Sequence, residues 1–211
     1  RESLNAITAY NQKSAEHIRE DEAKTDHYED IIGSYLVKLS ARKIGESDSA
    51  LAAEYLRIIG DFERIADHSV NILESAEEMQ QKGIAFSAAA LQEYATMAGA
   101  VREVTALAYD SFVSGDVQAA RQVEPLEQVI DDLKEEMRTR HIRRMQQGSC
   151  GIEAGFIWSD LLTNLERVSD HCSNIACCMI EGDDHNLHRH EVLQSIRGSG
   201  EIFDREYSSY R

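Results

Sequence analysis

The ten residues at positions 63–72 read ERIADHSVNI, and a closely similar phrase, ERVSDHCSNI, recurs at positions 166–175. Six of the ten positions are identical, and five of those six are polar. Core packing would preserve apolar character, with Ile and Val interchangeable, whereas a repeat of Glu, Arg, Asp, His and Asn suggests chemistry held in duplicate. The repeat therefore predicts two related halves, each carrying part of the function.

Composition and charge narrow the possible functions. The chain has 211 residues, and one duplication of about a hundred residues favours two fused halves. One proline and 42% hydrophobic residues fit a compact helical protein. The 38 acidic and 22 basic residues give a net charge of −16, which repels nucleic acid and free phosphate alike. We therefore expect no nucleic-acid partner, and any bound anion needs a cation or a local Arg cluster.

Neither a membrane span nor a leader is visible in these residues. No stretch approaches the roughly 18 apolar residues needed to cross a bilayer, and the first residues lack the apolar region of a signal peptide. The four cysteines lack the spacing of a zinc site or of a disulfide framework, which indicates reduced thiols in a cytosolic compartment. We expect this piece to be soluble.

Helical periodicity runs along nearly the whole chain, interrupted by short stretches rich in Gly and polar residues. We predict an all-α fold with no strand and with helices at about 14–43, 50–81, 86–114, 116–147 and 153–181, then a shorter helix in the tail. Pro125 predicts a kink just before Glu127, because it removes a backbone donor inside the fourth helix. The expected organisation is repeat 1 at 1–83, repeat 2 at 84–184 and a helical tail at 185–211.

A fainter repeat lies on the helices that precede the two phrases. Residues 22–26 read EAKTD and residues 127–131 read EQVID, so each half carries two pairs of acidic residues four apart. By the same offset, residues before about Asn11 match only the end of the helix predicted at 86–114. We therefore expect the first half to lack most of its opening helix, and the chain to be a fragment.

The spacing of these acidic pairs predicts that they meet. Residues four apart lie about 40° apart around a helix, and residues at equal height in an antiparallel hairpin are equidistant from its apex. The midpoint between positions 22 and 67, which is also that between 26 and 63, lies beside Gly45. The midpoint between positions 127 and 170, which is also that between 131 and 166, lies at Gly148 and Ser149. Both centres fall on predicted loops. In each hairpin we expect four carboxylates at one level: Glu22, Asp26, Glu63 and Asp67 in the first, and Glu127, Asp131, Glu166 and Asp170 in the second.

Four converging carboxylates favour a bound cation. Like charges four apart on a helix already cost roughly 0.2–0.5 kcal/mol, and partial burial raises that cost. Oxygen-only ligands suit divalent or trivalent ions such as Mg, Ca, Mn or iron, and the absence of Cys and His from the stripe argues against structural zinc. The alternative is that these are solvated faces, since a single Glu-x-x-x-Asp pair is common on acidic helices.

Other polar residues of the phrases lie beside the carboxylates: Arg64, His68, Asn71, Arg167, His171 and Asn174. The histidines lie off the acidic stripe, so we expect them to form hydrogen bonds at a helix interface. The arginines either pair with acidic neighbours or contact an anion bound to the metal. The asparagines are either extra metal ligands or caps of packing contacts. A basic run, RTRHIRR at 138–144, is explained by the helix dipole, with a docking surface for anionic lipid or a membrane partner as the alternative.

With these residues in place, the chain resembles the PhoU family of phosphate-uptake regulators. The resemblance implies two three-helix bundles whose Glu/Asp-x-x-x-Asp motifs bind multinuclear metal clusters, with the eight carboxylates above as ligands. More narrowly, YLVKLS at 35–40, the segment 159–175 and FDREYSSY at 203–210 resemble the cytosolic region of bacterial sodium/phosphate cotransporters. This narrower resemblance implies a metal-binding regulatory module at the cytoplasmic face of the membrane, with a transporter domain in the same polypeptide.

Several functions remain open at this point. A free-standing PhoU regulator shares the same motifs, with inorganic phosphate bound through the metal and a homo-oligomer as further expectations. A di-metal enzyme in a helical bundle usually adds Glu-x-x-His pairs, which this sequence lacks. No phosphate-binding loop of the G-x-x-x-x-G-K type and no recognisable nucleophile is present, so we expect no catalysis. A helical scaffold with simply solvated acidic stripes is the third alternative.

Overall fold

The computed structural model describes residues 1–42, 44–183, 196 and 201–210. Within these residues every regular element is a helix, so the predicted all-α class is confirmed. The helices are α1 Glu2–Ala6, α2 Gln12–Ser40, α3 Glu46–Lys82, α4 Ala88–Ser114, α5 Val117–Ala120, α6 Val123–Gln146, α7 Ile152–Asp183 and α9 Glu201–Tyr210. Most of the predicted tail at 185–211 lies outside the described residues.

Helix ends follow local signals in the sequence. The side chain of Asn11 accepts hydrogen bonds from the first backbone N–H groups of α2, and Asp116 does the same for α5. Gly115 ends α4 in the left-handed conformation (φ 67°), which a residue without Cβ adopts at little cost. The N–H of Asp116 then reaches back to the carbonyl of Ser111. The caps at Gly115 and Asp116 explain why the break at 114–116 is visible in the sequence.

The helix predicted at 116–147 is wrong in one respect, because the chain forms two helices there. α5 ends at Ala120, the chain turns at Arg121 and Gln122, and α6 begins at Val123. Pro125 therefore lies in the first turn of α6, where its missing N–H would have had no partner inside the helix. The expected kink before Glu127 is replaced by this clean break.

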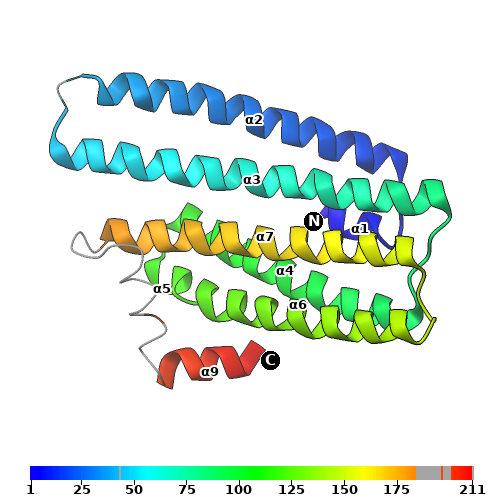
Figure 1. Ribbon diagram of the computed structural model, residues 1–211. Helices are drawn as coiled ribbons and strands as arrows, with labels where there is room; N and C mark the ends of the chain where they lie inside the picture. Colours follow the sequence, from blue (N-terminus) through cyan, green and yellow to red (C-terminus); the bar gives the residue numbers. More distant parts are fainter. Residues whose placement is uncertain (43, 184–195, 197–200, 211) are drawn as a thin grey trace.

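The long helices lie side by side, with α7 in the middle (Figure 1). α7 packs against α3, α4 and α6, and α2 packs on the outer side of α3. The main core joins α3, α4, α6 and α7 through fully buried side chains such as Leu73, Met97, Ile130 and Leu165. The α2–α3 turn and the α6–α7 turn lie at opposite ends of the molecule (Figure 1). Among the described residues, none of the helices has the length and apolar character of a membrane span.

Candidate metal centre

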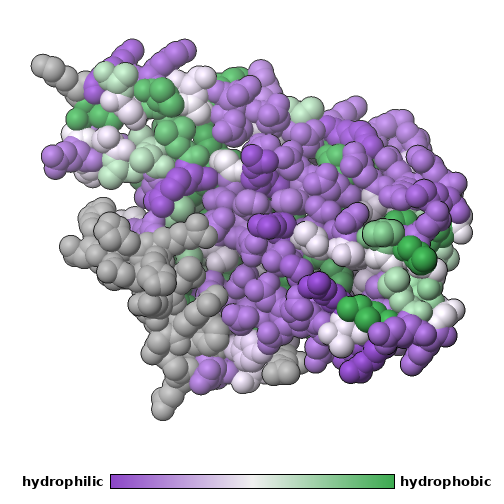
Figure 2. All heavy atoms as spheres, in the orientation of Figure 1, coloured by the Kyte–Doolittle hydropathy of each residue, from purple (hydrophilic) through white to green (hydrophobic). Residues whose placement is uncertain are grey.

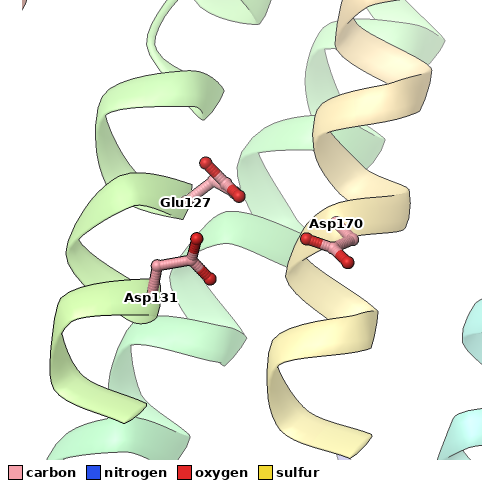
Figure 3. Close-up of side chains that lie close together, drawn as sticks. All are labelled: Glu127, Asp131 and Asp170. Carbon is pink, nitrogen blue, oxygen red and sulfur yellow. The ribbon is translucent and has the colours of Figure 1, made fainter. Parts of the chain in front are cut away.

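Three carboxylates converge between α6 and α7. Glu127 and Asp131 stand one turn apart on α6, and Asp170 faces them from α7 (Figure 3). One oxygen from each of the three lies within 4.8 Å of the other two. Glu127 is buried, and both aspartates are half-buried. Part of the predicted constellation is therefore assembled in the second half.

The electrostatics of this cluster favour a counter-charge. Burial raises the pKa of Asp131, and the charges of Glu166 and Asp170 raise it further. Burial also raises the pKa of Asp170, with a further contribution from Glu166, while Arg167 opposes the shift. A raised carboxyl pKa means that the folded protein disfavours the charged form. A cation between the carboxylates would remove this penalty.

The fourth predicted carboxylate of this hairpin, Glu166, is held by a lysine. Lys134 Nζ lies 3.0 Å from Glu166 Oε1, and both side chains are largely buried. Glu166 stands one turn before Asp170 on α7, and its charge raises the pKa values of Asp131 and Asp170. Sequence reasoning missed Lys134, although its position three residues after Asp131 places it on a neighbouring stripe of α6.

The residues present fit a hard metal ion. The converging groups are all carboxylates, and oxygen donors are those that Mg²⁺, Ca²⁺, Mn²⁺ and iron accept. Glu127, Asp131 and Asp170 would hold the ion, while Glu166 is paired with Lys134. The mutual repulsion of three acidic groups in a partly buried site is the observation that makes a cation the natural occupant.

The first half does not assemble its four carboxylates in the same way. Glu63 and Asp67 stand one turn apart on α3, with Arg64 bridging them at 3.5 Å. Burial raises the pKa of Glu63, and the charge of Asp67 raises it further. The carboxylate on α2 that also raises this pKa belongs to Glu29. Asp26 is exposed, and Glu22 is half-buried. Among the described residues, a group of three ligand atoms within 4.8 Å occurs only between α6 and α7. A second metal site in this half stays a prediction.

The histidines of the two phrases form reciprocal hydrogen bonds between the halves. His68 Nδ1–H of α3 donates to Asn164 Oδ1 of α7 (2.9 Å), and His171 Nδ1–H of α7 donates to Asp61 Oδ1 of α3 (2.8 Å). The two rings stack with centroids 5.6 Å apart. Asn174 also donates to Asp61 (3.0 Å). The prediction that both histidines bond at a helix interface is confirmed.

The partners of these histidines were missed from the sequence. Asp61 and Asn164 occupy the same place in the two halves, two residues before each phrase begins. Extending the comparison of the phrases by two residues would have found them. Among the remaining phrase residues, Arg167 lies 3.7 Å from Asp170, and Asn71 is exposed.

The comparisons with known proteins concern the family and the fold. The PhoU domain family model matches residues 1–76 and 94–179. The phosphate-specific transport system accessory protein PhoU homolog 1 of Thermotoga maritima is 31% identical over 57% of this chain, and the match spans about half of that relative (51%). Homolog 2 of the same organism is 23% identical over 97% of this chain and 87% of the relative.

Two solved structures share the fold. PhoU from Pseudomonas aeruginosa superimposes with a TM-score of 0.81 at 22% identity, and the match covers 88% of each chain. The phosphate transport system regulatory protein PhoU from Streptococcus pneumoniae gives a TM-score of 0.76 at 18% identity, covering 89% of this chain and 87% of the other. At these identities the likeness concerns the fold alone.

Proposed function

Because this chain belongs to the PhoU family, we propose that it is an accessory regulator of phosphate transport that binds a metal ion between α6 and α7. The observation that carries the metal proposal is the convergence of Glu127, Asp131 and Asp170 within 4.8 Å. The regulatory proposal rests on the family and on relatives named as accessory proteins of phosphate-specific transport.

The protein's own residues would hold the ion and set its surroundings. The bound ion would supply positive charge and open coordination positions for an anion. Asp131 and Asp170 would lose their mutual repulsion, and Glu127 would contribute an oxygen from a buried position. Inorganic phosphate fits such a centre because it could reach a chain with a net charge of −16 only through a local positive charge. Phosphate status would then be read at the metal centre.

The partner is proposed to be a component of a phosphate transport system. Relatives with matching sequence are named as accessory proteins rather than transporters, which favours a free-standing regulator over the fused cotransporter domain expected from the sequence. The fused arrangement and a position at the cytoplasmic membrane face remain predictions, and the full-length reading frame tests both. Regulation without catalysis agrees with the family, whose relatives here carry accessory and regulatory names.

Metal analysis combined with thermal unfolding tests the metal proposal. Protein purified without chelator should contain metal, and added metal should raise the melting temperature, because it binds carboxylates that are assembled only in the folded state. The double variant Asp131→Asn with Asp170→Asn should lose both effects. The matched control, Glu135→Gln with Asp160→Asn, removes the same charge from exposed positions of α6 and α7 and should retain them.

Two outcomes would contradict the proposal. Metal-free protein whose melting temperature is the same in chelator and in Mg²⁺, Mn²⁺ or iron would exclude the metal centre. Phosphate uptake that responds normally to phosphate supply in cells carrying the Asp131/Asp170 double variant, expressed at the wild-type level, would exclude a regulatory role for it.

A further inference from the structure

A groove between α6 and α7 runs from the metal centre towards the turn of this hairpin. It encloses about 440 Å³, and its apolar lining includes Ile142, Ile152 and Phe156. Ile152 and Phe156 are 68% and 69% exposed, and Ile142 is 48% exposed. Figure 2 shows hydrophobic side chains gathered at this end of a mostly hydrophilic surface. Such an apolar patch on a highly charged protein marks an interaction surface.

The floor of the groove carries buried polar atoms without partners. His141 is 7% exposed and Trp158 is 1% exposed. Within the described part of the chain, His141 Nε2 and Trp158 Nε1 have no hydrogen-bond partner. A buried donor or acceptor left unpaired costs about 1–3 kcal/mol. Both residues line the groove, while these two nitrogen atoms themselves are buried beneath it.

Gly155 allows α6 side chains to pack closely against α7 beneath the groove. A Cβ at this position would lie 3.0 Å from His141 Nε2 and 3.1 Å from Met145 Sδ. The glycine therefore allows the two α6 side chains to lie directly against α7, and no side chain from this position fills the groove. The hollow is thus built by the sequence of both helices.

The α6 wall of the groove is basic, although the whole protein is acidic. Residues 134–144 of α6 carry five basic and two acidic side chains, in a chain whose net charge is −16. Lys134 and Arg138 line the groove itself. Arg138 is exposed, and its ion pair with Glu135 is long, with 3.7 Å between Nη1 and Oε1. A partner that carries carboxylates would therefore complement the charge of the α6 wall of this groove.

We propose that this groove docks an amphipathic helix of a partner protein, with apolar residues on one face and at least one carboxylate. A channel between two antiparallel helices suits a third helix, whose apolar side chains at i, i+3/i+4 and i+7 enter it. An anionic membrane surface could cover the exposed Ile152 and Phe156 but, being flat, would not fill a groove of about 440 Å³ between two helices. The observations thus favour a protein helix over a lipid surface.

Lys134 connects this groove to the metal centre, in a step that rests on the proposed function. It lines the groove and also holds Glu166 at 3.0 Å, beside Asp131 and Asp170. When a metal ion draws Glu166 to the centre, Lys134 becomes free to pair with a carboxylate of the docked helix. Metal binding and helix docking then strengthen each other, and by linkage the effect is equal in both directions.

Photocrosslinking in the native host tests the docking site. The photoreactive amino acid p-benzoylphenylalanine replaces Phe156 in the full chain, and the matched control carries it at Val113, which is similarly exposed on α4. Adducts at position 156 above the level at 113, mapped by mass spectrometry to an amphipathic helix with Asp or Glu, are expected. Adducts only with lipid, only with a second copy of this chain, or at the level of the control would overturn the proposal.

The crosslinked segment, made as a synthetic peptide, then tests the groove residues and the link to the metal. In chelator, Arg138→Glu and Phe156→Ser should each weaken binding about tenfold, while Val113→Ser should not. Circular dichroism checks that each variant is folded. Equal affinity of all variants would overturn the docking site.

A titration of the same peptide in Mn²⁺ tests the role of Lys134. Peptide affinity should rise with Mn²⁺ in the wild type and stay constant in Lys134→Gln. If the wild type takes up Mn²⁺ but peptide affinity does not change, the Lys134 link is wrong. If it takes up no Mn²⁺, the proposed metal centre is wrong, and binding in chelator still decides the groove.

Discussion

At the scale of single residues, Asp170 is a side chain whose charged form is disfavoured in the folded protein. Its pKa is raised by burial and by Glu166, one turn away on α7. We predict that Asp170→Asn makes the metal-free protein more stable, by roughly 0.2–0.5 kcal/mol for the relieved like-charge pair, and abolishes stabilisation by metal. The gain should vanish as the pH falls and Asp170 is protonated in the wild type. Urea unfolding in chelator and in Mn²⁺ measures both effects, and a less stable variant in chelator would refute the repulsion.

His141 changes the pH dependence of stability in the opposite direction to Asp170, because protonation creates its charge rather than removing it. Burial against Trp158 lowers its pKa, and the charge of Arg144 lowers it further, while Glu93 opposes the shift. Because the folded state favours the neutral ring, the free energy of unfolding is maintained above the ordinary histidine pKa of about 6.5 and is lost as the pH falls below it. We predict that His141→Gln flattens this loss, which is at most about 1.4 kcal/mol per pH unit for one proton.

The measurement for His141 is urea unfolding between about pH 7.5 and about pH 5, the range over which imidazoles titrate. The other histidines are present in both proteins, so their contributions cancel in the comparison. A pH dependence that is identical in the wild type and in His141→Gln would show that His141 is not the responsible group.

At the scale of elements, the start of α6 shows how one proline can be harmless. Pro125 stands in the first turn after Val123, where backbone N–H groups have no partner inside the helix. We predict that Pro125→Ala lowers the free energy of unfolding by less than about 1 kcal/mol, mainly through a more flexible unfolded chain. Glu136→Pro, in the middle of the same helix, should cost about 3 kcal/mol or more. Chemical denaturation compares the two, and a Pro125→Ala variant about 3 kcal/mol more stable than the wild type would place Pro125 inside a continuous helix instead.

At the scale of the whole molecule, the duplicated phrases join the halves to each other. Asp61 accepts hydrogen bonds from His171 and Asn174, and His68 donates one to Asn164. We predict that Asp61→Ala costs about 1–3 kcal/mol, because it removes the acceptor of the half-buried His171 Nδ1–H across the α3–α7 interface. His171→Ala should cost less in the Asp61→Ala background than in the wild type, with a coupling of roughly 0.5–3 kcal/mol in a double-mutant cycle. Strictly additive effects would mean that the halves do not depend on this contact.

Local patterns explain why much of the fold could be predicted. Helix periodicity, the N-cap of Asn11 and the left-handed turn at Gly115 all act within a few residues, so the sequence contains them directly. The break between α5 and α6 was missed because Arg121 and Gln122 are ordinary helix formers. Pro125 disfavours a helix that continues through residue 121, and the chain responds with a turn at Arg121 and Gln122 instead of a kink.

The sequence by itself determined the helical class, the family and the residues capable of chemistry, because periodicity and the acidic spacing are properties of each helix alone. The tertiary structure decided which of those residues meet. Both halves carry two acidic pairs, yet the three-carboxylate cluster forms between α6 and α7, while Glu63 of the first half has Glu29 as its charged neighbour from α2. Whether carboxylates converge depends on the rotation and register of packed helices, to within a few ångströms. Those are set by how the buried side chains of neighbouring helices fit together, which no motif within a single helix specifies.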